Sequence, residues 1–339
     1  MELHGKVLRA LWLSLSLSAT LVTPTLAQGP QLGGPLPTPF PLFPPDNWWN
    51  LDISTAPLDP NSASFINWIG GDELHPDLGH ELPPDNVNIY GLPYIVVDAS
   101  QPKRTVTFDY PDESDQIGYP IPDEAITQPH WIEHGEPGNV YVPGVDRHML
   151  IVDKDNKYLY ELYNTYWNGS KWTACCGAFF DMKTNNRRPE TWTSADAAGL
   201  AILPGLIRYE EVYGTDEIKH AFRFTVGMTN RYVYPASHEA GRNAGALPMG
   251  ARLRLKSSKD ISGLLPEVQK IARAMKKYGL IVADNGADMF VQGTYDSRWD
   301  TETLHDQFSL LNANDFEVVQ LGWRGTPSSA GTSPDGGEQ

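Results

Sequence analysis

Short runs of β-branched and aromatic residues recur along the chain, each bounded by turn residues, and this pattern is typical of β-strands. The runs predict strands at 94–98, 103–109, 149–153, 157–163, 172–180, 220–226, 251–257, 280–283 and 316–319. Polar and apolar residues alternate most regularly at 251–257, where Arg252 and Arg254 flank Leu253, so this strand is expected to be half-buried.

Two segments have the spacing of a helix instead. Ser262 can cap the first one, Pro266 suits its first turn and Gly279 ends it. Its apolar face consists of Val268, Ile271, Ala272 and Met275. A second helix is expected from Ser62. Together the elements predict a mainly β fold, an antiparallel β-sandwich or barrel with a few peripheral helices, in a single globular domain over 46–323.

The N-terminus has the features of a secretory signal peptide at 1–27. Lys6 and Arg9 precede an apolar stretch at 10–22, and Thr25-Leu26-Ala27 forms a small-x-small cleavage site. Cleavage there makes the mature protein secreted and extracellular, whereas an uncleaved signal anchor is the alternative. Because no later stretch has 18 consecutive apolar residues, no membrane partner is expected after signal cleavage.

Two further segments are expected to lie outside the packed domain. Residues 28–45 carry seven prolines and three glycines and no charge, which predicts an extended linker rather than packed structure. Residues 324–339 are rich in Ser, Gly and Pro and are expected to form a disordered tail.

The charge of the chain limits its partners. With 42 acidic and 26 basic residues the net charge is −16, which argues against nucleic acid as a partner. Acidic residues concentrate at 46–161, where 21 face only 5 basic ones. This excess indicates either an acidic face around a cation or a neutral sugar, or a solvated surface. An anionic substrate would need a local basic pocket, for which Arg187-Arg188 and Arg252, Arg254 and Lys256 are the candidates.

Common catalytic signatures are absent from the sequence. It has no GxSxG, GxxxxGK or GxGxxG motif, and no cofactor is expected. His130, Glu133 and His134 spell the H-x-x-E-H pattern of zinc proteases, but Pro129 and Gly135 leave barely one helical turn, so the pattern is not expected to bind zinc. Cys175-Cys176 is expected to be a structural pair, with a vicinal redox switch as the alternative.

Three carboxylates are candidate catalytic groups. Glu161 lies within an aromatic strand, where desolvation raises the pKa of a carboxyl toward that of a general acid; alternatively, it pairs with a buried arginine. Asp196 lies among small residues that let a ligand approach closely, although it or Ser194 can instead cap a short helix at 195–200. Glu210 is the candidate for the second carboxylate that glycoside hydrolysis requires.

Histidines, arginines and tryptophans complete the candidate site. His148 and His220 are predicted to position substrate or relay protons, and with His238 they form an alternative three-histidine metal site. The predicted substrate-binding residues are Arg147, Arg223, Trp192 and Trp167. Exposed tryptophans stack on sugar rings, but the ten tryptophans of the chain can equally pack a large β core.

Four segments resemble a family of secreted, mostly bacterial proteins of unassigned function. They are 45–54, 146–153, 193–209 and 248–256, and the similarity runs over most of the mature chain. The resemblance implies an extracellular context and no particular activity. Neither Cys175-Cys176 nor the pair His130 and His134 belongs to the shared pattern.

These features predict a secreted hydrolase that acts on a polysaccharide or oligosaccharide through paired carboxylates. A non-catalytic extracellular carbohydrate-binding or cell-surface module is the alternative, and a metal-dependent extracellular enzyme with histidine ligands is the second alternative.

Overall fold

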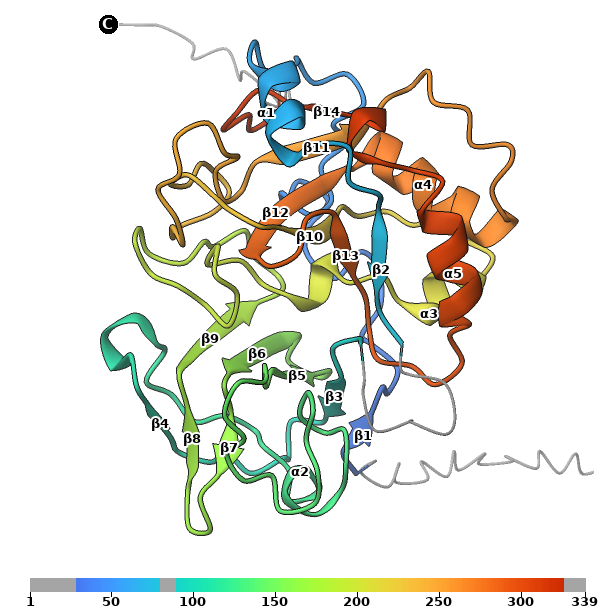
Figure 1. Cartoon of the computed structure of the whole chain (residues 1–339). Coiled ribbons are helices and arrows are strands. Elements are labelled where there is room, and N and C mark those ends of the chain that lie inside the picture. Colours follow the sequence, from blue (N-terminus) through green and yellow to red (C-terminus); the bar gives the residue numbers. More distant parts are fainter. Residues whose placement is uncertain (1–28, 80–89, 326–339) are drawn as a thin grey trace, which may run out of the picture.

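The computed structural model describes residues 29–79 and 90–325, and it is built mainly from β-strands (Figure 1). The strands are β1 Gln31–Leu32, β2 His75–Asp77, β3 Tyr94–Val97, β4 Val106–Phe108, β5 Met149–Asp153, β6 Tyr158–Tyr163, β7 Tyr166–Trp167, β8 Trp172–Ala174, β9 Cys176–Asp181, β10 Phe222–Val226, β11 Arg252–Leu255, β12 Leu280–Asn285, β13 Phe290–Gln292 and β14 Phe316–Val318. The α-helices are α1 Ser62–Ile69, α2 Glu124–Thr127, α3 Tyr209–Tyr213, α4 Pro266–Lys277 and α5 Thr301–Phe308. Single 3-10 turns occur at Pro111–Glu113, Leu203–Gly205 and Ala313–Asp315.

The strands form three sheets within the described residues. The five-stranded sheet has the order β1-β3-β5-β6-β9, the six-stranded sheet β14-β11-β12-β10-β13-β2 and the three-stranded sheet β4-β8-β7. Each sheet is mixed, because β3 and β5, β10 and β12, β2 and β13, and β4 and β8 run parallel while the other pairs are antiparallel. None of these sheets closes into a barrel.

Both faces of the five-stranded sheet are buried. Side chains alternate across a strand, so Tyr94 and Val96 of β3 join one apolar cluster while Ile95 and Val97 join another. The strand therefore reads as a continuous apolar run rather than an alternating one, as expected for a sheet covered on both sides.

The six-stranded sheet is covered by helices α4 and α5, which lie side by side along it (Figure 1). Helix α4 buries Val268, Ile271 and Met275 in the same apolar cluster as the sheet. Pro266 stands at its first position, where no backbone N–H is needed, and two lysines in its last turn favour the negative end of the helix dipole.

The mainly β fold predicted from the sequence is confirmed, with corrections. The sheets are mixed rather than purely antiparallel, a barrel is not formed by the described residues, and packing as a sandwich stays a prediction. The run 172–180 is divided into β8 and β9 at Cys175, and the short helix expected at 195–200 is a turn. Helix α4 begins after Leu265 and has no side-chain cap, so Ser262 is not its cap.

The proline-rich segment expected to be a linker is packed where it is described. Gln31–Leu32 pairs with β3 in antiparallel fashion, and Leu42 and Phe43 are buried in the apolar cluster of the five-stranded sheet. Asn50 fixes the end of the segment, because its side-chain Nδ2 donates to the carbonyls of Phe43 and Pro44. Prolines favour extended backbone, but they do not prevent the apolar side chains between them from packing.

The expected signal peptide at 1–27 lies outside the described residues, as does 326–339 of the expected tail. Across 29–79 and 90–325, no helix combines the length and apolar character needed to cross a membrane.

Candidate functional site

Polar side chains from distant parts of the chain gather where β2, β5, β6, β10 and β12 end or begin. We call this group the polar cluster; it consists of Asp77, Glu133, Asp146, His148, Tyr163, Asp196, Arg223 and Asp284. Asp77 ends β2, Tyr163 ends β6 and Arg223 lies in β10. The cluster thus draws its members from both large sheets.

A buried ion pair lies at the centre of the polar cluster. Nη2 of Arg223 is 2.7 Å from Oδ1 of Asp196 and 3.8 Å from Oδ2 of Asp284. Arg223 and Asp196 are almost completely buried. Burial raises the pKa of Asp196 to about 7, against the opposing charge of Arg223. Oδ2 of Asp196 and Nε and Nη1 of Arg223 have no hydrogen-bond partner among the described residues, so the pair retains polar capacity.

His148 forms a second buried pair with Glu133. Its Nδ1 lies 2.5 Å from Oε2 of Glu133, and its Nε2 lies 3.2 Å from the carbonyl oxygen of Ala195. Burial is the largest effect and disfavours the imidazolium, but the charge of Glu133 and its hydrogen bond together outweigh burial and raise the pKa of His148 to about 9. Burial also opposes ionisation of Glu133, yet His148 holds the pKa of that carboxyl below its ordinary value. The two are therefore a charged pair at neutral pH.

The accessible side of the cluster is formed by Asp146, Tyr163 and Asp284. The hydroxyl of Tyr163 donates to Oδ1 of Asp146 at 2.8 Å, and the Tyr163 ring lies 4.9 Å from the ring of His148. Asp146 is exposed, and the side chain of Asp284 keeps 30% of its surface exposed. Burial raises the pKa of Asp284, although Arg223 works against the shift. Asp284, whose pKa is raised, therefore interacts electrostatically with the exposed carboxyl of Asp146.

Asp77 contributes a further carboxyl. Burial raises its pKa to about 6, and Nε2 of Gln292 donates to its Oδ2 at 3.0 Å. The charges of Glu133, Asp146 and Arg223 all act on it. Oε1 of Gln292 is buried without a partner among the described residues. The pKa of Asp77 is thus raised while that of Glu133 is lowered, and the two carboxyls interact electrostatically. Acid–base chemistry needs carboxyls whose pKa values are displaced in opposite directions.

Glu161 lies beside the polar cluster but is engaged in local backbone bonds. Its carboxylate accepts hydrogen bonds from the backbone N–H groups of Ile202 and Leu203 at 2.9 to 3.0 Å, and its side chain is completely buried. Burial raises its pKa to about 7, as the sequence predicted in direction. These bonds fix the 3-10 turn at Leu203–Gly205 rather than leaving an oxygen for substrate. The predicted pairing with an arginine is limited to an electrostatic effect of Arg223.

Glu210 and His220 belong to a different site. Both line a cavity of about 820 Å³, together with Phe40, Tyr94 and Arg208. Nε2 of His220 lies 3.0 Å from Oε2 of Glu211, and Nη2 of Arg208 contacts the other oxygen of that carboxylate. Despite burial, these two groups lower the pKa of Glu211 to about 2. Glu210 is exposed and pairs with Arg298.

The other predicted substrate-binding residues have structural contacts. Arg147 is buried and donates to the carbonyls of Thr165 and His134 and to the side chain of Asn139. Trp192 lies beneath the guanidinium of Arg188, and Trp167 packs against Trp172. Of the nine tryptophans in the described residues, five are buried, Trp167, Trp192 and Trp323 are partly buried, and Trp68 is 48% exposed.

The histidines proposed as metal ligands do not converge. His148 pairs with Glu133, His220 with Glu211, and Nδ1 of His238 lies 2.8 Å from the carbonyl oxygen of Ala197. Among the described residues, no three His, Cys, Asp or Glu side chains are grouped so as to hold a metal ion. Cys175 and Cys176 are free thiols.

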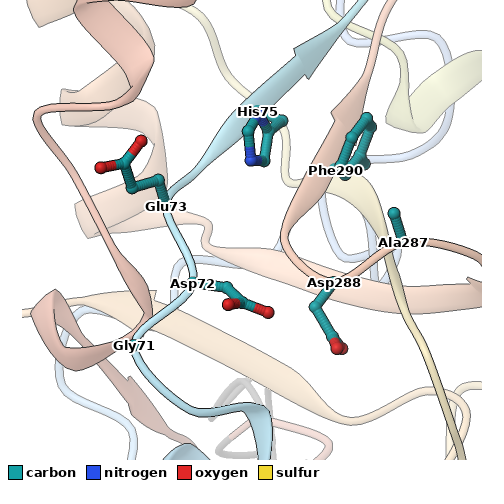
Figure 2. Close-up of a pocket in the computed structure, with 7 residues that line it drawn as sticks. All are labelled: Gly71, Asp72, Glu73, His75, Ala287, Asp288 and Phe290. Carbon is teal, nitrogen blue, oxygen red and sulfur yellow. The ribbon is translucent and has the colours of Figure 1, made fainter.

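A third, more acidic hollow lies beside β2 and β13 (Figure 2). Its volume is about 430 Å³. Figure 2 shows the carboxylates of Asp72 and Asp288 on its inner side, while Glu73 points away. The ring of His75 stacks on Phe290 at 4.6 Å. Because Asp288 already accepts a hydrogen bond from the Gly227 backbone N–H, we assign no chemistry to this hollow.

Sequence reasoning identified His148, Asp196 and Arg223 but missed the carboxyls around them. One signal was available: Asp284 directly follows the apolar run at 280–283, at the end of a strand. Glu133 was noted only as part of the zinc-protease pattern that was rejected, and Asp77 lies in the three-residue strand β2, whose own sequence carries no such signal.

Comparison of the chain with protein-family models, curated proteins and solved structures gives no match. The resemblance to a family of secreted proteins stays a prediction.

Proposed function

We propose that the protein is a secreted hydrolase of glycosidic bonds, and that the polar cluster is its catalytic site. The observation that carries the proposal is the gathering of Asp77, Asp146, Asp196 and Asp284, from four separate segments, around Arg223 and His148. Glycoside hydrolysis needs one carboxyl that holds a proton and another that is ionised. The raised pKa of Asp284 and the exposure of Asp146 suit those two roles.

Each residue has a distinct part in this mechanism. Asp284 donates the proton to the leaving oxygen, because its pKa is raised and its side chain remains accessible. Asp146, oriented by the hydroxyl of Tyr163, acts as the base or nucleophile. Asp196 is a positioning residue that holds Arg223, and Glu161 positions the backbone at Ile202. Polysaccharide or oligosaccharide is the proposed partner, and an extracellular location follows from the signal peptide predicted at 1–27.

The proposal is tested with Asp284→Asn and Asp146→Asn in the mature chain. Each variant should lower the release of reducing ends from a polysaccharide panel by about 100-fold or more, because the acid or the base is lost. Both carboxyls are at least partly exposed, so the variants should fold. Asp306→Asn, the same change at an exposed position of α5, is the matched control and should leave activity unchanged.

Two results would overturn the proposal. One is full activity in both variants. The other is a wild-type protein that is retained on a polysaccharide but releases no reducing ends, which would favour the carbohydrate-binding module.

A further inference from the structure

A buried arginine on the six-stranded sheet has no partner for its guanidinium. Arg252 of β11 is 4% exposed, and none of its three side-chain nitrogens has a hydrogen-bond partner among the described residues. Burying a cation without an opposite charge is costly, and native arginines at this depth are normally paired.

Two neighbouring arginines on the same sheet have carboxylate partners, whereas Arg252 has none. Arg252 and Arg223 both lie opposite Ile281 in the strand register, so the two side chains project from the same face. Arg223 has Asp196, and Arg254, two residues along β11, has Glu317 and three backbone carbonyls. Arg252 alone of these three arginines has no carboxylate partner.

The surroundings of Arg252 carry further unused donors and positive charge. Tyr234 acts electrostatically on Arg252. The rings of Trp48 and Tyr234 are nearly perpendicular, with their centroids 6.3 Å apart, and the indole Nε1 of Trp48 is also buried without a partner among the described residues. The guanidinium of Arg324 lies 4.1 Å from the ring of Tyr234, and that of Arg187 lies 5.6 Å from it.

We propose that the buried, unpartnered guanidinium of Arg252 binds an oxyanion, namely a carboxylate, sulfate or phosphate group, on the side of Tyr234 and Trp48. A planar guanidinium whose Nε, Nη1 and Nη2 are all free matches two oxygens of such a group. A water molecule would satisfy an N–H group but leave the charge uncompensated. This site goes beyond the proposed hydrolase and does not depend on it, because no residue of the polar cluster takes part.

Burial lowers the pKa of Arg252 to about 10, which is the effect expected for a cation that lacks an anion. Tyr234 opposes this lowering of the Arg252 pKa but does not offset the effect of burial. A bound oxyanion would remove this penalty and stabilise the folded chain by mass action.

The test measures thermal unfolding of the mature chain in sodium sulfate, with sodium chloride keeping the ionic strength constant. Wild-type protein should show a saturable rise in Tm of several degrees. Arg252→Met should lose this rise and be at least as stable as wild type without sulfate, since an unpaired buried cation is removed. Arg252→Lys keeps the charge but loses the planar fork, and should bind sulfate at least about tenfold more weakly.

Arg242→Gln, at an exposed arginine that pairs with Glu239, is the matched control and should respond to sulfate as wild type does. Glucuronate and a sugar sulfate in place of inorganic sulfate distinguish an oxyanion carried by a glycan from a free ion; a response to either supports the site. The absence of a saturable rise in wild type, or an equal rise in the Arg252 variants, would overturn the proposal.

Discussion

At the scale of single residues, the pKa values of the polar cluster are set by opposing effects of burial and charge. Desolvation raises the pKa of Asp196 and Asp77 because the groups that oppose it, Arg223 and His148 for Asp196 and Gln292 and Arg223 for Asp77, do not offset it. For His148 the charge of Glu133 and the hydrogen bond to Glu133 together exceed the effect of burial, and the pKa is displaced toward the charged form. The pKa of Asp77 is thus raised to about 6 by burial, whereas that of His148 is raised to about 9 by its carboxylate partner.

This balance predicts a specific response to Glu133→Gln. Without the carboxylate, burial and the charge of Arg223 remain, so the pKa of His148 should fall from about 9 to below its ordinary value. Titration of the imidazole followed by NMR measures the midpoint. Glu136→Gln, at an exposed position of the same loop, should leave it unchanged. An unchanged midpoint in Glu133→Gln would show that Glu133 does not hold the proton on His148.

The residues of the site were partly predictable from sequence. His148 and Arg223 were found because charged residues beside or within apolar strands are conspicuous. Their partners were not, since Glu133 lies in a loop without periodicity and Asp77 in a strand of three residues. The order of the strands in the sheets determines which acid lies beside which base, and a single sequence does not contain that order.

At the scale of elements, every described strand of four or more residues overlaps a predicted run, as do the three-residue strands β4, β8 and β14. The runs at 149–153 and 157–163 correspond to β5 and β6 within one residue. The missed strands β1, β2, β7 and β13 have only two or three residues each. Such strands are defined by the neighbour that they pair with, and a local apolar pattern does not reveal them.

The packing of the proline-rich segment before residue 46 is likewise determined by its neighbours in the fold rather than by its own pattern. This packing yields a stability prediction. Phe43 is 5% exposed and packs in the apolar cluster of the five-stranded sheet, whereas Phe40 is 44% exposed. Phe43→Ala should therefore lower the free energy of unfolding by about 3 kcal/mol, and Phe40→Ala by less than about 1 kcal/mol. Urea unfolding of the mature chain measures both. Equal losses would mean that the segment does not contribute its own core residue.

At the scale of the whole molecule, buried acids and net charge act together on stability. Folding raises the pKa of Asp77 to about 6 and of Glu161 and Asp196 to about 7. The folded state therefore binds more protons than the unfolded state between about pH 4 and pH 7, and stability falls as these groups ionise. The net charge of −16 at pH 7 adds repulsion in the same direction.

The paired groups have the opposite dependence at low pH. Glu211, with a pKa of about 2, and Glu133 are stabilised as anions, and their contribution is lost as pH falls below about 4. The contribution of protonated His148 is present below about pH 6.5 and is lost as pH rises through about 9. All of these effects together place the maximum of stability near about pH 5.

We therefore expect the free energy of unfolding to decrease from about pH 5 to about pH 8, by on the order of 1 to 3 kcal/mol for each buried acid. Urea unfolding across this range measures it. Glu161→Gln keeps an oxygen that accepts from Ile202 or Leu203 but cannot ionise, so its stability should decrease less steeply with pH than that of wild type. Glu302→Gln, at an exposed position of α5, should follow the wild-type curve. Stability that instead increases toward pH 8 would mean that Asp77, Glu161 and Asp196 are ionised and stabilised as anions in the folded chain.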